Sequence, residues 1–205
     1  MSPPFRFPNH RLVPVFLAVA MAMAVACTAT TGTVGKTGGR VGDQAPDFQG
    51  IANWINSDPL TMEELRGKVV LIDFWTYTCV NCIRTMPYLK RWHAKYADKG
   101  LIIVGVHSPE FEFEKLTPNV VDRANTFGLT YPIAQDNDFA TWRAYSNRAW
   151  PAKYLVDKDG VVRYKHFGEG SYNETEQQIR ELLISAGAEV SDVKLITVPD
   201  PKFLP

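Results

Sequence analysis

The sequence is poor in cysteine, carries no excess of charge and has only one long apolar run, and each scarcity excludes a class of function. Only three of the 205 residues are cysteines, and no second C-x-x-C and no H-x₃₋₅-H pattern completes the four ligands of a zinc site. We therefore expect no metal. The 22 basic and 22 acidic residues cancel, which leaves no electrostatic footprint for nucleic acid. An apolar content of 45% and a charged content of 21% exclude wholesale disorder and a protein with many membrane spans.

The one long apolar run lies near the amino terminus and is typical of an export signal. Arg6 and Arg11 precede residues 12–26, which carry no charge and end in the small-x-small pattern Ala24-Val25-Ala26. The run is shorter than the about 20 residues of a membrane-spanning helix. We predict that residues 1–26 are a signal peptide and that the protein is exported to the periplasm or cell envelope. An uncleaved amino-terminal anchor is the alternative.

Cys27 follows this run directly, and the segment from Ala24 to Cys27 resembles the lipobox of bacterial lipoproteins, although Leu is usual where Ala24 stands. We predict that Cys27 is lipidated and holds the protein at the membrane. The alternative is an ordinary signal-peptidase cut beside an incidental cysteine. Residues 27–40 are rich in Thr and Gly without apolar periodicity, which is typical of a flexible linker.

The two remaining cysteines, Cys79 and Cys82, are separated by two residues and follow an apolar run. If that run is a strand and the next residues form a helix, Cys79 lies at the helix N-terminus, where unpaired N–H groups and the helix dipole favour a thiolate. A loop this short removes little chain entropy, so the spacing argues against a structural disulfide. It predicts a redox pair in which Cys79 attacks and Cys82 resolves.

Strands and helices alternate around this pair and predict an α/β domain over residues 41–188. The predicted strands are residues 69–75, 101–106, 131–134, 153–156 and 161–166, and the predicted helices are residues 79–98, 120–127 and 139–145. Capping-box patterns at residues 61–64 and 173–176 predict a short helix and the start of the last helix. Residues 189–205 are rich in Pro, and we expect an irregular tail.

Several positions around the cysteines resemble one family. Residues 73–75 read Asp-Phe-Trp shortly before Cys79, Pro87 lies five residues after Cys82, and Pro151 directly precedes the predicted hairpin. In these features the chain resembles the thioredoxin superfamily, and within it the exported TlpA/ResA-like thiol–disulfide oxidoreductases. Residues 105–114 and 168–170 are most similar to the periplasmic domain of CcdA/DipZ-type proteins.

This resemblance implies a thioredoxin-like fold, with a central mixed β-sheet flanked by helices and an N-terminal extension. It also implies disulfide exchange without a cofactor. The expected partners are exported proteins that carry a disulfide or a dithiol, with a CcdA-like membrane protein as electron donor. We expect the protein to act as a monomer.

Two acids are candidates for proton transfer. Asp73 interrupts an apolar strand, where burial of a carboxylate is costly and raises its pKa. The resemblance implies that Asp73 moves the proton of the resolving thiol, while the alternative is an acid hydrogen-bonded to backbone at a strand end. Glu110 matches an acid that ResA-like proteins place beside their cysteines. The alternative is a solvated loop acid in company with Glu112 and Glu114.

The resemblance also implies a substrate groove. Pro151 corresponds to a cis-proline beside the cysteine pair, and Trp150 and Tyr77 are predicted to line the groove, unless Trp150 simply caps the core. Thr78 departs from the family, whose members commonly have Trp before the first cysteine. The intervening Val80-Asn81 matches no variant of known direction, so the direction of electron flow stays open.

Two other functions remain as alternatives. A peroxiredoxin-like thiol peroxidase would need a Pro-x₃-Thr-x₂-Cys setting, which the residues before Cys79 do not provide. A non-catalytic metallochaperone could use Cys79, Cys82 and His107 as ligands.

Overall fold

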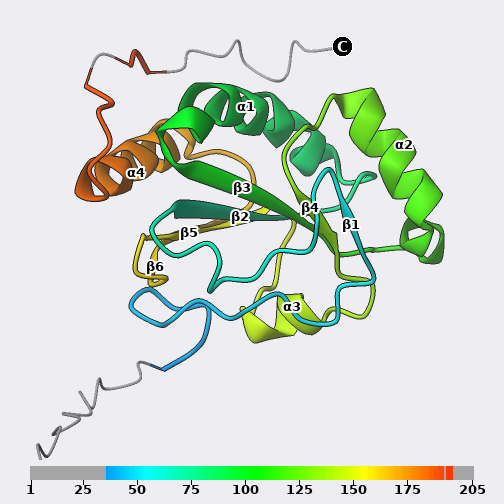
Figure 1. Cartoon of the computed structure of the whole chain (residues 1–205). Helices are drawn as coiled ribbons and strands as arrows, with labels where there is room; N and C mark the ends of the chain where they lie inside the picture. Colours follow the sequence, from blue (N-terminus) through cyan, green and yellow to red (C-terminus); the bar gives the residue numbers. More distant parts are fainter. Residues whose placement is uncertain (1–35, 192, 196–205) are drawn as a thin grey trace, which may run out of the picture. The chain divides into compact units, whose positions relative to one another are not determined.

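The computed structural model describes residues 36–191 and 193–195 (Figure 1). The predicted signal peptide, the lipidation site Cys27 and most of the predicted linker lie outside these residues. Within the described part of the chain, no helix is both long enough and apolar enough to cross a membrane.

A six-stranded sheet forms the centre of the domain, in the order β1-β4-β3-β2-β5-β6. Its strands are β1 Asn53–Ile55, β2 Val69–Trp75, β3 Leu101–His107, β4 Ile133–Gln135, β5 Ala152–Val156 and β6 Val162–Phe167. The pairs β2–β3 and β3–β4 are parallel, whereas β1–β4, β2–β5 and β5–β6 are antiparallel. The predicted mixed sheet is confirmed.

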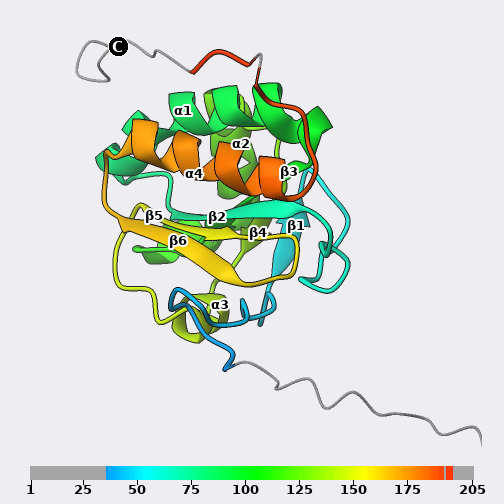
Figure 2. The same cartoon turned by 90° about the vertical axis from the view of Figure 1, so that its left-hand side faces the viewer.

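Helices cover both faces of this sheet. They are α1 Val80–Tyr96, α2 Thr117–Phe127, α3 Ala140–Ala144 and α4 Tyr172–Ser185, and short 3-10 helices span Ala97–Lys99 and Glu112–Lys115. Figure 2 shows α1 and α4 side by side on one face and α3 on the other. Pro87 lies inside α1, as the sequence predicts.

The position of β2 inside the sheet explains why its sequence is almost wholly apolar. All seven of its residues are buried, because helices and loops cover the sheet on both sides. Alternate residues pack into different clusters: Val69, Leu71 and Trp75 join the cluster under α1 and α4, and Val70, Ile72 and Phe74 join the opposite one. Asp73 shares the alternation of the first set, so it belongs to the α1 face of the strand.

Two of the predicted helix starts are wrong. Thr61 and Glu64 do form the reciprocal hydrogen bonds of a capping box, at 3.0 and 3.2 Å. The residues that follow nevertheless form only turns, which end at Gly67 in a left-handed conformation with φ +83°. The last helix begins at Tyr172, not at the predicted box of residues 173–176, and Ser171 precedes it with φ 47°. Glu176 of that box is buried and accepts a 2.7 Å hydrogen bond from Tyr96 Oη.

The sequence analysis also missed strand β1, whose three residues are too short for a visible alternation. In the tail, the described residues after Ala188 form no helix or strand, as expected. They are nevertheless packed, since Val190 is 1% exposed and belongs to the core under α1 and α4.

The hydrogen bond from Tyr96 to Glu176 joins the far end of α1 to α4 and generates a stability prediction. Tyr96→Phe leaves the buried Glu176 without this donor, so the free energy of unfolding should fall by about 1–3 kcal/mol. Urea denaturation checks the value. The reactivity of Cys79 should not change, because Tyr96 lies at the opposite end of a 17-residue helix; a change in both quantities would contradict this separation.

Candidate active site

The two cysteines lie where β2 ends and α1 begins. Trp75 is the last residue of the strand, and Cys79 is the N-cap of the helix with extended backbone (φ −72°, ψ 108°). Its Sγ accepts a hydrogen bond from the backbone N–H of Cys82 at 3.3 Å. Both thiols are free, with Cys79 partly exposed and Cys82 only 2% exposed. One sulfur is therefore accessible to another molecule and the other is not.

The surroundings of the two thiols shift their pKa values in opposite directions. Hydrogen bonds from the Cys82 thiol and from the N–H groups of Cys82 and Asn81 lower the pKa of Cys79 to about 7, against the opposing effects of burial and of the Glu110 charge. Burial raises the pKa of Cys82 far above its usual range, and the neighbouring Cys79 and Asp73 add to the rise. Near neutral pH, a large part of Cys79 is therefore thiolate, whereas Cys82 stays a thiol.

Asp73 lies behind this pair in the middle of β2. It is 1% exposed, and burial raises its pKa to about 7, while the positive charge of Lys153 opposes that rise. Lys153 is its direct partner across the β2–β5 ladder, and Lys153 Nζ lies 4.0 Å from Asp73 Oδ1. Within the described part of the chain, neither of these atoms has a hydrogen-bond partner. A carboxyl that titrates near neutral pH therefore lies in the electrostatic field of Cys82.

The sequence analysis missed Lys153 and Tyr131 as members of this site. Lys153 is fully buried in a strand whose other residues are apolar or aromatic, and that interruption was the available signal. The ring of Tyr131 approaches the strand because Gly105, opposite Asp73 in β3, has no side chain: a Cβ there would lie 3.1 Å from Tyr131 Cε2. Asp73 and Cys82 both contribute to a raised pKa of Tyr131, after burial.

The structure distinguishes Glu110 from Glu114. The side chain of Glu110 is exposed, and its negative charge acts on Cys79. Glu114 is fully buried, and its Oε1 accepts a 2.7 Å hydrogen bond from the hydroxyl of Thr78, the residue before the nucleophile. The alternative interpretation, in which Glu110 is a solvated loop acid in company with Glu112 and Glu114, is wrong for Glu114. No local pattern signals this burial, because the N-cap three residues before Glu114 is Phe111 and not one of the Ser, Thr, Asp or Asn residues that mark a capping box.

Tyr77 points into the protein. It is 7% exposed, its ring stacks on His107 with centroids 5.6 Å apart, and its hydroxyl donates to Phe113 O at 3.2 Å. His107 is buried and lies 3.3 Å from Thr76 Oγ1 through Nε2, and burial lowers its pKa to about 4. Tyr77 therefore presents almost no surface to a substrate, and His107 is neutral near pH 7.

Trp150 and Pro151 are joined by a cis peptide bond. The Trp150 indole is partly buried, donates from Nε1 to Ser108 O at 3.0 Å, and packs against Trp142 with ring centroids 4.4 Å apart. It also packs, like Cys79, against the core cluster under α1. Trp150 thus covers part of the core and keeps part of its surface exposed, while its contact with a substrate stays a prediction.

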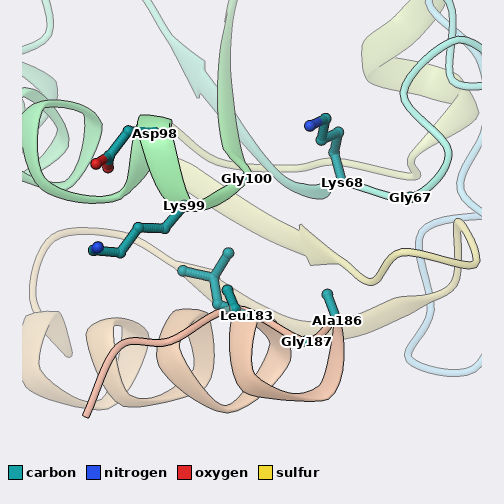
Figure 3. Close-up of a pocket in the computed structure, with 9 residues that line it drawn as sticks. Gly67, Lys68, Asp98, Lys99, Gly100, Leu183, Ala186 and Gly187 are labelled. Carbon is teal, nitrogen blue, oxygen red and sulfur yellow. The ribbon is translucent and has the colours of Figure 1, made fainter.

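The structure assembles no metal site from the residues that it describes, where no group of three or more His, Cys, Asp or Glu side chains could hold an ion. In particular, Cys79, Cys82 and His107 do not form one. A shallow cavity of about 270 Å³ lies at the opposite end of the sheet, lined by residues before β2, after α1 and at the end of α4, among them Lys68, Lys99 and Leu183 (Figure 3). It has no part in the chemistry of the cysteines.

Comparison with known proteins agrees with this geometry. A model of the AhpC/TSA family matches residues 41–165. Protein DipZ of Mycobacterium tuberculosis is 49% identical over 161 residues, which are 76% of this chain but 23% of that protein. The thiol-disulfide oxidoreductase ResA of Bacillus anthracis is 27% identical over 175 residues, 85% of this chain and 97% of ResA.

A solved structure from Chlorobium tepidum, described as a thiol:disulfide interchange protein DsbE, superimposes with a TM-score of 0.63 at 27% identity and covers 70% of this chain and 98% of its own. The predicted fold class is thereby confirmed. The family match spans more than half of the sequence and contains both cysteines. The chain belongs to the AhpC/TSA family, as a thioredoxin-like domain similar to thiol–disulfide oxidoreductases.

Proposed function

We propose that this protein exchanges disulfides with partner proteins through Cys79 and Cys82. The observation that carries the proposal is the asymmetry of the pair: a partly exposed thiolate at a helix N-terminus, and a buried thiol one turn along the same helix. That arrangement supplies a nucleophile for an incoming disulfide. The second sulfur is too buried to meet another molecule, so it can form a disulfide only with Cys79.

In the first step, the Cys79 thiolate attacks one sulfur of a partner disulfide. A mixed disulfide forms between Cys79 and the partner, and the other partner sulfur leaves as a thiolate. The N–H of Cys82 supports the attacking thiolate from 3.3 Å. Trp150 and Pro151 flank the partner in this proposal. Tyr77 supports the turn from inside, a role that differs from the substrate contact predicted from sequence.

In the second step, Cys82 attacks Cys79 in the mixed disulfide. The proton of Cys82 passes to Asp73, the Cys79–Cys82 disulfide forms, and the partner leaves fully reduced. Two electrons have then passed from this protein to its partner. Lys153 keeps part of the Asp73 population ionised near neutral pH, because its charge opposes the rise in the Asp73 pKa. The exposed Glu110 acts only through its charge on Cys79.

We propose that the protein works as a reductant. A strongly acidic nucleophile stabilises the reduced form and makes an oxidant, as in a DsbA-type cysteine with a pKa of about 3.5, whereas thioredoxin has a pKa of about 7. The pKa of Cys79, about 7, is of the second kind.

The setting of this activity is also a proposal. The similarity to DipZ and ResA and the sequence pattern of residues 1–27 support an exported domain, anchored through lipidated Cys27. It would act as a monomer on exported proteins with a disulfide or a dithiol, and a CcdA-like membrane protein would return its electrons. No cofactor takes part in either step.

A thiol peroxidase is the second candidate, because the chain belongs to the AhpC/TSA family and has Thr76 three residues before Cys79. Two observations weigh against it. The Thr76 hydroxyl lies 3.3 Å from His107 Nε2, and position 72, where a peroxidatic motif has Pro, is Ile72 in the middle of β2.

Cysteine variants test the proposed steps. Cys82→Ser should accumulate a mixed disulfide between Cys79 and an insulin chain after attack on an insulin disulfide, because nothing resolves it, and mass spectrometry detects the adduct. Cys79→Ser should lower insulin reduction by at least about a hundredfold, since the remaining thiol is buried and not ionised. Wild-type protein that consumed peroxide faster than it reduced insulin would support the peroxidase instead.

The reduction potential tests the proposed direction. Equilibration of the Cys79–Cys82 pair with glutathione buffers should give a value near that of thioredoxin, about −270 mV. A value near −120 mV, typical of a DsbA-type protein, would contradict the reductant and leave the exchange chemistry itself intact.

Lys153→Met tests the proton step. Loss of the positive charge raises the pKa of Asp73 further, so less Asp73 is ionised at neutral pH. The second, resolving release of thionitrobenzoate from Ellman's reagent should slow roughly fivefold at pH 7 and recover above about pH 9, as expected for a shift of about one pKa unit. Asp73→Asn should remove this pH dependence. Lys158→Met, which removes a charge paired with Asp159 in the hairpin turn, is the control and should leave both phases unchanged.

A further inference from the structure

Glu114 is a buried ionisable group that the proposed steps leave unused. It is fully buried, yet both carboxylate oxygens are engaged. Oε1 accepts from the hydroxyl and the N–H of Thr78, at 2.7 and 3.3 Å, and Oε2 accepts from the N–H groups of Glu110 and Phe111, at 2.6 and 3.0 Å. Four donors from two separate segments therefore converge on one side chain.

These donors determine the charge of Glu114. Burial alone raises the pKa of a carboxyl, but hydrogen bonds from Thr76, Thr78 and the two loop N–H groups reverse the effect, and the pKa of Glu114 lies below its usual value. Glu114 is thus an anion, and each of its oxygens acts only as an acceptor. No neutral side chain of similar size offers four acceptor positions in this geometry.

Glu114 joins the turn before the nucleophile to the loop after β3. A second bond, from Tyr77 Oη to Phe113 O, makes the same connection one residue earlier. Thr78 is itself exposed, and the hydrogen bond from its hydroxyl to Glu114 fixes the orientation of its side chain.

Cys79 depends on the position of this turn. Its pKa is lowered by hydrogen bonds from the thiol and N–H of Cys82 and from the N–H of Asn81, and these reach Sγ only while Cys79 is the extended N-cap of α1. Fixing Thr78 at both its N–H and its hydroxyl restricts the rotation of the peptide that leads into Cys79.

We propose that Glu114 is a positioning residue for the thiol–disulfide exchange proposed above: by holding Thr78, it keeps Cys79 in the conformation that stabilises its thiolate. The proposal also accounts for Thr78, which stands where similar proteins commonly have Trp. A threonine places a short hydroxyl 2.7 Å from the carboxylate.

Glu114→Gln tests the inference in the full-length protein. A glutamine amide has one acceptor oxygen and one donor nitrogen. Its nitrogen therefore faces either the N–H groups of Glu110 and Phe111, which loses two of the four bonds, or the N–H of Thr78, which loses one and turns the Thr78 hydroxyl into an acceptor. The pH profile of Cys79 alkylation by iodoacetamide, with Cys82 protected by burial, reports the pKa of Cys79. We expect a rise of about 0.5 to 1 unit, which leaves roughly two- to fivefold less thiolate at pH 7.

Three further variants separate positioning from general destabilisation. Thr78→Val should raise the Cys79 pKa in the same direction, whereas Thr78→Ser keeps the hydroxyl and should restore the wild-type profile. Because Thr78 is exposed, these variants test the proposal even if Glu114→Gln fails to fold. Glu176→Gln changes another buried glutamate at the far end of α1 and should lower stability without moving the profile.

The outcomes are distinct. An unchanged Cys79 pKa in Glu114→Gln and Thr78→Val would overturn the inference, and so would a fall, which would mean that the carboxylate acts only through its charge. A shift equal to that of Glu176→Gln would also overturn it. Alkylation needs no partner protein, so failure of the wild-type protein to reduce insulin would refute the proposed function alone.

Discussion

The hydrogen bond from the Cys82 N–H to the Cys79 sulfur is the interaction on which the candidate chemistry depends. It exists because β2 ends at Trp75 and α1 starts at Val80, so that the first free N–H groups of the helix point at Cys79. The rest of the domain keeps this junction in place. The sheet fixes β2 between two neighbours, and the packing of α1 on its face fixes the helix.

The same packing gives the two sulfurs different chemistry without any difference in residue type. Cys79 lies before the first helical turn and reaches the surface, whereas Cys82 lies within that turn and faces the core. Behind Cys82, the sheet carries an aspartate and a lysine that would be replaced by apolar residues if stability alone were selected, because a buried ion pair seldom stabilises a fold. The domain therefore retains a costly pair directly behind its buried sulfur.

Features set by neighbouring residues in the chain could be predicted from the sequence. The bounds of β2, the position of Cys79 at the start of α1 and the parallel pairing of β2 with β3 follow from an apolar run, a short spacing and a helical period. Features set by contacts across the fold could not. Lys153 meets Asp73 only through the β2–β5 register, and Glu114 meets Thr78 only after a loop folds back over 36 residues. For the same reason the choice between Glu110 and Glu114 was beyond local patterns, and the burial of Tyr77 follows from its stacking on His107.

The first described segment of the chain has a geometric consequence. Gln44 bridges to Val161, and Gly42 donates to Val162 O, at the end of the hairpin where Val162 pairs with Val156 and Val156 with Val70, the second residue of β2. Cys79 follows the opposite end of that strand. The polypeptide thus enters the domain at one pole of the sheet and exposes its nucleophile at the other. The segment that leads into the sheet therefore leaves the surface around Cys79 free of its own contacts.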